Sequence, residues 1–402
     1  MINRDVIKAY ALKNAVEHDG KALINSVISG LFNEGLKKED IKKIIPKIQE
    51  IINEVNKLDS LIQKNEYEKL KKFVGQRKVR EGLPELEKVG KKGVVMRFSP
   101  SPSGPLHIGH ALTASPSFLY YKRYGGKFYV RIEDTNPENI YKPSYEMIEK
   151  ESRWLFDDKT KFVIQSNRMN LYYKYIEKLL RKNAVYVCTC SQDKFKSYIL
   201  NKKACPCRGL SIKDQMMRWK KMLDKKGYKE GEAVIRFKSG MYYKNPAFRD
   251  FPLARINTSK HPLQNNKYKV WPLMNLAVIV DDIEMKMTHI IRAKDHRDNA
   301  EKQKLVFRVL GKKYPVTYFL GRIHIKGMEL SSSKMRGDIE NGKYKGWDDP
   351  NLLTVQSLKK KGYKPIAIHK LAEQIGLNEV DKIIERKELF LLLDNFNKQK
   401  NL

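Results

Sequence analysis

Two histidines, His107 and His110, follow a turn rich in proline, serine and glycine in the stretch 97-RFSPSPSGPLHIGH-110. Because prolines fix φ and remove donors, we expect a stiff turn. The few helix breakers after His107 predict a helix, whose first turn offers free N–H groups and a positive dipole end to phosphate. Gly109 leaves room for a flat ligand against the backbone. Taken alone, so short a pattern also fits two surface histidines or a metal-binding pair.

The residues around this turn predict a unit of alternating strands and helices. The apolar run 94–98 indicates a buried strand, and 107–121 a helix. A second strand, 127–133, ends in Glu133 and Asp134. Further expected elements are strands at 271–282, 288–292 and 314–324 and a helix at 299–310. In an open α/β sheet, side chains at the carboxyl ends of the strands face the ligand crevice.

Three charged residues end predicted strands: Arg97 the first, Glu133 the second and Arg292 a late one. Two cationic groups and one anionic group suit a ligand with two carboxylates and one ammonium. Arginine suits a carboxylate because its fork is bidentate and permanently charged. For each arginine considered singly, a structural ion pair is an equal alternative.

A short hydroxyl-rich and basic stretch, 331-SSSK-334, lies about 220 residues after the histidine pair. Such a stretch is typical of a mobile loop that closes on phosphate, and Lys334 would neutralise a departing pyrophosphate. A solvated surface loop is the alternative for this stretch alone.

All four cysteines fall within twenty residues, as Cys188, Cys190, Cys205 and Cys207. Two Cys-x-Cys pairs supply the four thiolates of a closed tetrahedral zinc site. Clustered cysteines in a reducing compartment favour metal over disulfides. The alternative is a set of reduced, buried cysteines without metal.

The composition predicts a polyanionic partner. The 402 residues carry a net charge of +34, which favours nucleic acid; a lysine-rich solvated surface is the alternative. The sequence contains no run of about 18 apolar residues, so it predicts no membrane span. The N-terminus lacks the apolar core of a signal peptide, so we expect a cytoplasmic protein with no membrane partner.

We expect five segments along the chain. In 1–90, apolar residues at helical spacing from Ile44 to Leu58 predict a helical domain, with a helix break near Pro46. The other expected segments are the first half of an α/β catalytic domain at 91–165, a cysteine-bearing insertion at 166–268, the second half of the catalytic domain at 269–336 and a helical stem at 337–402.

Several ordered motifs carry a family resemblance over about residues 94–375. They are 97-RFSPSPSGPLHIGH-110, 131-RIEDTNP-137, 280-VDD-282, 291-IRAKDH-296 and 346-GWDDP-350. Together with the Ser/Lys stretch, they resemble a class I aminoacyl-tRNA synthetase, and among these the archaeal type of glutamyl-tRNA synthetase. The resemblance implies a Rossmann-like parallel-sheet catalytic domain with an inserted acceptor-binding domain, a helical N-terminal domain and a helical C-terminal stem.

The resemblance also implies an activity: ATP-dependent attachment of L-glutamate to the 3′ end of tRNA(Glu), and of tRNA(Gln) in some members, through glutamyl-adenylate. ATP, Mg²⁺ and a structural Zn²⁺ are the implied cofactors. The implied catalytic residues are His107, His110 and Lys334. The implied ATP-binding residues are His107, Gly109, His110, Ser331, Ser332, Ser333 and Lys334, and the implied glutamate-binding residues are Arg97, Ser99, Ser101, Glu133, Met274, Asn275 and Arg292.

The chain departs from the family pattern at two places. Met274 and Asn275 stand where the family usually has a tyrosine and an aspartate, and that tyrosine helps to position the amino acid. In the phosphate-binding stretch, Ser332 stands where a lysine is expected, so the role passes to Lys334.

Archaeal-type relatives continue into β-barrels that read the anticodon, whereas a helical tail is expected here at 389–402. We therefore expect a separate β-barrel subunit; recognition through the acceptor arm alone, or a fragment, are the alternatives. The rival activities are a glutaminyl enzyme, which Arg292 disfavours, glutamyl transfer to a modified tRNA base, and a non-catalytic tRNA-binding scaffold.

Overall fold

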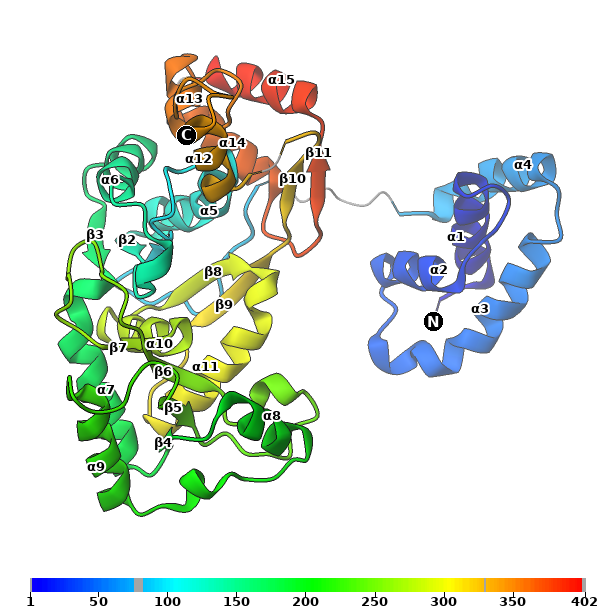
Figure 1. Cartoon of the computed structure of the whole chain (residues 1–402). Helices are drawn as coiled ribbons and strands as arrows, with labels where there is room; N and C mark the ends of the chain where they lie inside the picture. The colour runs from blue at the N-terminus through cyan, green and yellow to red at the C-terminus, as the bar shows by residue number, and fades with distance from the viewer. Residues whose placement is uncertain (1, 76–81, 329, 400–402) are drawn as a thin grey trace. The chain divides into compact units, whose positions relative to one another are not determined.

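The computed structural model describes residues 2–75, 82–328 and 330–399. The chain forms two compact units, Met1–Arg80 and Glu81–Leu402 (Figure 1). No helix of the described residues is long and apolar enough to cross a membrane. Short 3₁₀ turns occur at Phe32–Glu34, Lys38–Asp40, Lys71–Phe73, Pro137–Asn139, Gln165–Arg168, Pro206–Gly209, Pro246–Phe248 and Lys294–His296.

The first unit is helical, as expected. Its α-helices are α1 (Arg4–Glu17), α2 (Ile24–Leu31), α3 (Ile41–Val55) and α4 (Ser60–Leu70). The apolar face of α3 lies in the core of the unit, where Ile48, Ile51, Ile52 and Val55 are buried.

The expected break near Pro46 is wrong, because α3 runs through this residue. A proline here removes the hydrogen bond to the Lys42 carbonyl. Lys42 and Pro46 are both exposed, so water can satisfy that carbonyl. The burial of Ile48 and Ile51 on the same helix then outweighs the lost bond.

The second unit contains a parallel sheet of β1 (Val94–Phe98), β2 (Gly126–Ile132) and β3 (Lys161–Ile164), in that order. The crossover helices are α5 (Ile108–Tyr124) and α6 (Ser144–Leu155). A second parallel pair, β8 (His289–Ala293) and β9 (Val316–Leu320), adjoins β1. There the Thr288 N–H donates to the Val95 carbonyl at 3.0 Å. β1 thus lies between β2 and β8. The strand order switches direction at β1, and such a switch point opens a ligand crevice at the carboxyl ends of the strands.

The expected strand 271–282 is wrong. Its residues divide between a short strand, β7 (Val270–Pro272), and a helix, α10 (Met274–Glu284). The helix is buried from Leu276 to Asp282. An apolar run carries no period that separates a buried helix from a buried strand, and Pro272 cannot donate in a longer ladder.

The segment between β3 and β8 has an antiparallel sheet of β4 (Val185–Cys188), β5 (Val234–Phe237), β6 (Pro252–Ile256) and β7. Its helices are α7 (Met169–Arg181), α8 (Gln192–Leu200) and α9 (Ile212–Leu223), drawn in green in Figure 1. A single apolar core joins this sheet to α10 and to α11 (Arg297–Val309). The antiparallel segment therefore packs directly on the helices that follow it.

The last segment is mainly helical, and its elements are α12 (Ser332–Glu340), α13 (Val355–Lys360), α14 (Pro365–Ile375), α15 (Arg386–Asn397) and the parallel strands β10 (Ile323–Ile325) and β11 (Lys382–Ile384). α14 packs on α5, where the buried His369 ring lies 2.9 Å from the Ser115 hydroxyl. Of the helical tail expected at 389–402, residues 389–397 are helical as part of α15, and 400–402 lie outside the described residues.

The loop expected at 331–334 is wrong, since α12 begins there. The Ser331 hydroxyl accepts from the Lys334 N–H at 3.4 Å and so caps the helix. Serine favours both loops and helix N-caps, and here Met335 is buried one residue after Lys334. That apolar anchor favours the helical alternative.

Candidate active site

His107 and His110 cap each other at the start of α5. The Nδ1 of His107 accepts from the His110 N–H at 3.3 Å, and the Nδ1 of His110 accepts from the His107 N–H at 3.4 Å. The two rings stack with their centroids 3.7 Å apart. Because each Nδ1 is an acceptor, each neutral ring carries its proton on Nε2. The pair therefore has two Nε2–H donors left for a ligand.

Burial keeps this histidine pair neutral. Burial lowers the pKa of His110 to about 4. Burial also lowers the pKa of His107 well below its ordinary value, and His110 lowers it further. Near pH 7 the two rings act as neutral hydrogen-bond donors.

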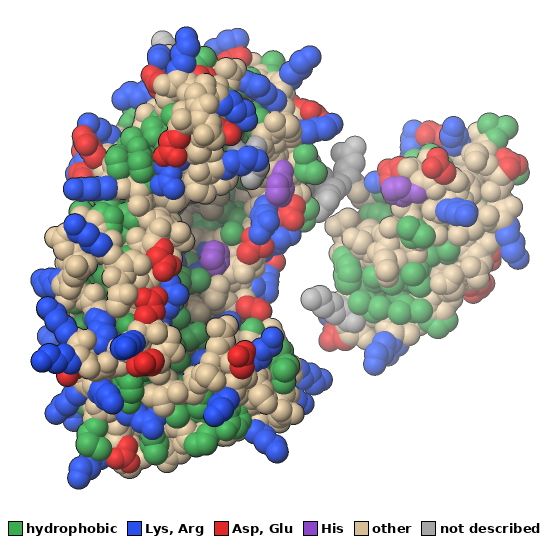
Figure 2. Space-filling model, in the orientation of Figure 1, with side chains coloured by type: hydrophobic (Ala, Val, Ile, Leu, Met, Phe, Trp, Pro, Cys, Tyr) green, Lys and Arg blue, Asp and Glu red, His purple; other side chains and the backbone are tan. Residues whose placement is uncertain are grey.

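A cavity of about 460 Å³ opens beside the histidines. It is lined by His107, Gly109, His110, Thr113, Ala293, Leu320, Gly321, Arg322, Ile323, His324, Ile325, Met328 and Leu330. A Cβ on Gly109 would lie 3.1 Å from the His107 ring and 3.2 Å from Leu330, so glycine keeps this wall open. A hollow with a histidine in it is visible on one face of the molecule (Figure 2). The sequence did not indicate Thr113, Arg322 or His324 as wall residues.

The start of α12 lies against the proline-rich turn. The Ser332 hydroxyl donates to the Pro105 carbonyl at 3.2 Å. A Cβ on Gly104 would come within 2.7 Å of the Ser332 Cβ, which shows how closely the two segments approach. The structure therefore brings the Ser/Lys stretch next to the turn of the histidine pair, and Lys334 lies in the first turn of α12.

Downstream backbone also holds this turn in place. The Ile108 N–H donates to the Leu353 carbonyl and the Val355 N–H to the Leu106 carbonyl, both at 2.8 Å. The buried Glu151 carboxylate accepts from the Leu106 N–H at 2.6 Å. These bonds fix the entry into α5 from two separate parts of the unit, the segment 353–355 and α6.

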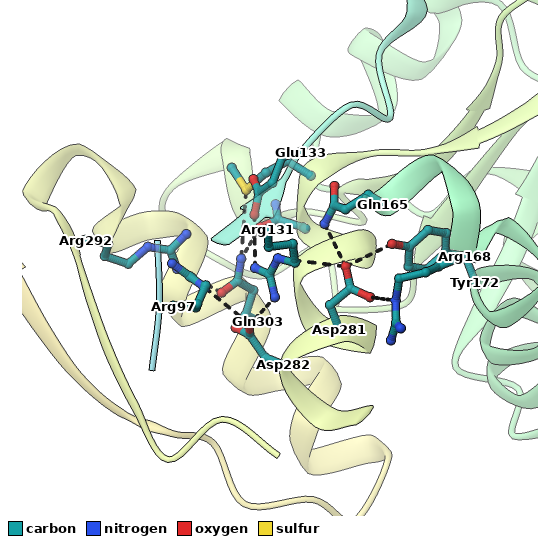
Figure 3. Close-up of polar contacts among 12 residues, drawn as sticks. Arg97, Arg131, Glu133, Gln165, Arg168, Tyr172, Asp281, Asp282, Arg292 and Gln303 are labelled. Carbon is teal, nitrogen blue, oxygen red and sulfur yellow. Dashed lines mark hydrogen bonds and ion pairs between the residues drawn. The ribbon is translucent and has the colours of Figure 1, made fainter. Parts of the chain in front are cut away.

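A network of buried charges lies at the ends of β1 and β2 (Figure 3). Arg131 donates to Asp282 at 2.6 Å and to Glu133 at 3.0 Å. The Arg97 Nε lies 3.4 Å from the same Asp282 oxygen. The predicted residues Arg97 and Glu133 thus meet in one crevice, and Arg131 and Asp282 connect them.

The helical form of 274–284 explains the role of its two aspartates. Asp281 accepts from Gln165 at 2.8 Å, from Arg168 at 2.6 Å and from Tyr172 at 2.9 Å, which ties α10 to the start of α7. Asp282 instead faces the arginines. Burial alone would raise the pKa of Asp282, but Arg131 and Arg97 outweigh burial and hold it below its ordinary value.

Arg292, at the end of β8, joins the same region with a different partner. Its Nη1 donates to the Gln303 Oε1 at 2.9 Å. Gln303 donates in turn to the Asn275 Oδ1 at 3.1 Å, and its Nε2 lies 4.0 Å from the Met274 sulfur. The Tyr314 hydroxyl donates to the Gln303 Oε1 at 3.2 Å.

Several buried polar atoms of this crevice lack a hydrogen-bond partner among the described residues. They are the Ser99 Oγ, the Arg131 Nε, the Asp282 Oδ2 and the Arg292 Nε. Unsatisfied buried groups are costly, so their gathering at one place indicates a ligand site.

Burial lowers the pKa of Arg97. The Asp282 carboxylate opposes this shift, and the positive charges of Arg131 and Arg292 lower the pKa of Arg97 further. Ser101 lies exposed in the turn.

The four cysteines form one cluster, with all four sulfur atoms within 4.8 Å of one another. The Sγ atoms of Cys188 and Cys205 are 3.8 Å apart, and those of Cys190 and Cys207 are 3.9 Å apart. A tetrahedron with Zn–S bonds of about 2.3 Å has S–S edges of about 3.8 Å. The donor set and its spacing therefore fit a zinc ion.

These features define the class of protein. A model of the family described as tRNA synthetases class I (E and Q), catalytic domain, matches residues 93–400. A glutamate tRNA ligase from Elizabethkingia meningosepticum, solved in complex with its amino acid, superposes with a TM-score of 0.53 at 20% identity, over 75% of this chain and 68% of that one. That likeness supports the fold and confirms the expected α/β class.

Other relatives, found by sequence, match nearly the whole of this chain at higher identity. A glutamate--tRNA ligase of Methanothermobacter marburgensis is 39% identical over 401 residues, covering 98% of this chain and 71% of the relative. A glutamate--tRNA ligase of Pyrococcus furiosus is 42% identical over 386 residues, covering 93% of this chain and 67% of the relative. The chain belongs to the class I tRNA synthetases of the glutamate and glutamine group, and the expected family resemblance is confirmed.

Proposed function

We propose that this chain is a glutamate--tRNA ligase that joins L-glutamate to the 3′ end of tRNA(Glu) through glutamyl-adenylate. The observation that carries the proposal is the charge pattern of one crevice. Arg97 and Arg292 supply two cationic groups, and Glu133 supplies an anionic one. This pattern complements two carboxylates and one ammonium. The names of the archaeal relatives support the same activity.

In the first step, a carboxylate oxygen of glutamate attacks the α-phosphorus of ATP. The bond from that phosphorus to the bridging oxygen of the β-phosphate breaks, and pyrophosphate leaves. The Mg²⁺ that accompanies ATP would neutralise part of the phosphate charge. The Nε2–H groups of His107 and His110 stabilise negative charge on the phosphate oxygens. Lys334, in the first turn of α12, neutralises the leaving pyrophosphate. In the second step, a ribose hydroxyl of the terminal adenosine attacks the activated carbonyl. The bond from that carbonyl to the phosphate oxygen of AMP breaks, and the hydroxyl proton passes to a phosphate oxygen of the leaving AMP.

The remaining ATP-binding and amino-acid-binding residues follow from their positions. Gly109, Ser331, Ser332 and Ser333 would bind the nucleotide, since they border the histidine turn or begin α12. The amino acid would lie between the arginines, with Ser99, Ser101, Glu133, Met274 and Asn275 around it. Arg292 would bind the side-chain carboxylate and Arg97 the α-carboxylate, which leaves Glu133 for the ammonium.

The four cysteines would hold a structural zinc ion that links β4 to the turn at Pro206–Gly209. The zinc ion supplies no chemistry to either step. Arg218 donates to the Cys207 Sγ at 3.2 Å, which stabilises a thiolate in that position. We propose 166–268 as the acceptor-binding insertion, 91–165 and 269–336 as the catalytic domain, and 1–90 and 337–402 as helical domains. A separate anticodon-binding subunit stays a prediction.

The test is aminoacylation of purified tRNA(Glu) and tRNA(Gln) with labelled glutamate and, separately, glutamine. We expect glutamate to be attached to the 3′ end of tRNA(Glu). Periodate treatment of the tRNA before the reaction should abolish this attachment, because it oxidises the terminal ribose. Charging with glutamine alone would indicate the glutaminyl activity, and label at a base would indicate transfer to a modified nucleotide. If neither amino acid is attached to tRNA and tRNA-dependent pyrophosphate exchange is absent, the chain is a non-catalytic scaffold and the proposal is refuted.

A further inference from the structure

Gln303 makes the polar contact that orients Arg292. The Gln303 side chain is fully buried. Its Oε1 accepts from Arg292 at 2.9 Å and from the Tyr314 hydroxyl at 3.2 Å, while its Nε2 donates to Asn275 at 3.1 Å. Both acceptor positions of the amide oxygen are thus filled, and the amide nitrogen has its own acceptor. This arrangement fixes which face of Gln303 meets Arg292.

The charge of Arg292 has no carboxylate partner, unlike the charges of the neighbouring arginines. Arg97 and Arg131 both form ion pairs with Asp282. Within 82–328 and 330–399, no carboxylate forms an ion pair with Arg292, whose hydrogen-bond partner is the neutral amide of Gln303. The positive charge of Arg292 is therefore available to a ligand.

The contact also limits which nitrogen of the guanidinium a ligand can reach. Gln303 occupies the Nη1 of Arg292, and the Arg292 Nε is buried without a partner among the described residues. Nη2 has no hydrogen-bond partner among the described residues and is not shut off from solvent as Nε is. Gln303 thus leaves Nη2 for a charge-assisted hydrogen bond to a ligand carboxylate.

We propose that Gln303 is a positioning residue that makes Arg292 selective for a second carboxylate. The proposal rests on the proposed function, and it deepens the assignment of the amino-acid substrate. A glutamate side chain neutralises the arginine, whereas the amide of glutamine leaves that buried charge unpaired. A carboxylate in place of Gln303 would remove this preference, because the protein itself would then neutralise Arg292.

The test compares Gln303→Glu and Gln303→Met with the wild-type chain. Tyr314 and Asn275 remain in both variants, and Met preserves the length of the side chain. Arg308→Gln is the control, because it also lowers the net charge by one from an exposed position on α11. Aminoacylation of tRNA(Glu) is measured over a range of glutamate and glutamine concentrations, and thermal unfolding checks that each variant is folded.

For Gln303→Glu we expect the KM for glutamate to rise at least about tenfold with kcat within about threefold, since a charged hydrogen bond to the substrate is weakened in binding. The ratio of kcat/KM for glutamate to that for glutamine should fall by a similar factor. Gln303→Met should raise the KM for glutamate less, because Arg292 loses its orientation but keeps its charge. Arg308→Gln should match the wild type.

A KM and a substrate ratio within about twofold of wild type in folded Gln303→Glu or Gln303→Met would overturn the proposal. Equal losses of kcat for both amino acids would also overturn it, since they indicate a purely structural role. If Gln303→Glu does not fold, the KM of Gln303→Met decides. Failure of the wild-type chain to charge glutamate would instead refute the proposed function.

Discussion

Arg131 and Asp282 form a fully buried ion pair, with Nη1 and Oδ1 2.6 Å apart, between the end of β2 and the last turns of α10. The same Asp282 oxygen lies 3.4 Å from the Arg97 Nε. One carboxylate thus holds two arginines whose mutual repulsion would otherwise oppose folding of the crevice.

Asp282→Asn should destabilise the protein by about 3–5 kcal/mol, because it removes the buried carboxylate that Arg97 and Arg131 share. Urea unfolding of the two proteins measures the difference in the free energy of unfolding. Asp295→Asn is the matched control: its ion pair with Arg322 is exposed, so its loss should leave the free energy of unfolding nearly unchanged. Equal effects of the two substitutions would contradict the role of burial.

His107→Asn and His110→Asn should each lower tRNA-dependent pyrophosphate exchange by about 10²–10³-fold, the usual loss for a donor that stabilises developing charge. Asparagine is a good N-cap, so the stability of His107→Asn should stay close to that of wild type. The exposed His18 on the first unit provides the control His18→Asn. A loss of exchange that follows unfolding in a melting experiment would count against a catalytic role.

Acid should destabilise the protein below about pH 6.5. The pKa values of His110 and His369 are lowered to about 4, in each case first by burial. Between pH 6.5 and 4 the unfolded chain binds protons on these histidines that the folded chain does not, so stability falls by about 1.4 kcal/mol per pH unit for each. The melting temperature measured over this range should fall, and it should fall less steeply in His369→Gln.

Glu151 acts in the opposite direction. Burial raises its pKa to about 7, although the Leu106 N–H and Gln356 oppose the shift. Its stabilising contribution is complete below the unfolded value of about 4.5 and is lost as the pH rises through 7. Glu151→Gln should therefore make the acid-induced fall in melting temperature steeper. A flatter fall would contradict the raised pKa of Glu151 in the folded protein.

Metal analysis of the purified protein should give about one zinc ion per chain, because one tetrahedral ion uses all four cysteines. Removal of zinc by a chelator should lower the melting temperature and expose four titratable thiols. Cys207→Ser should reduce the zinc content. A metal-free preparation that is as stable as the untreated protein would contradict the assignment.

The local chemistry of the site could be predicted from the sequence. Strand 94–98, the turn and the helix that begins at Ile108 follow from short-range signals: an apolar run, prolines that limit φ, and few breakers. The four cysteines likewise indicated one metal-binding cluster, because their spacing is a local property. The charges at positions 97, 133 and 292 indicated a crevice for a dicarboxylate.

The tertiary structure decided the rest. Residues 274–284 are a helix and not a strand, and 332–340 a helix and not a loop, because burial against distant segments selects between local conformations that the sequence leaves close in energy. The pairing of Arg131 with Asp282, and of Arg292 with Gln303, joins residues whose identities carry no mark of their partners. Which arginine is neutralised by the protein and which is left for the ligand is a property of the packed molecule alone.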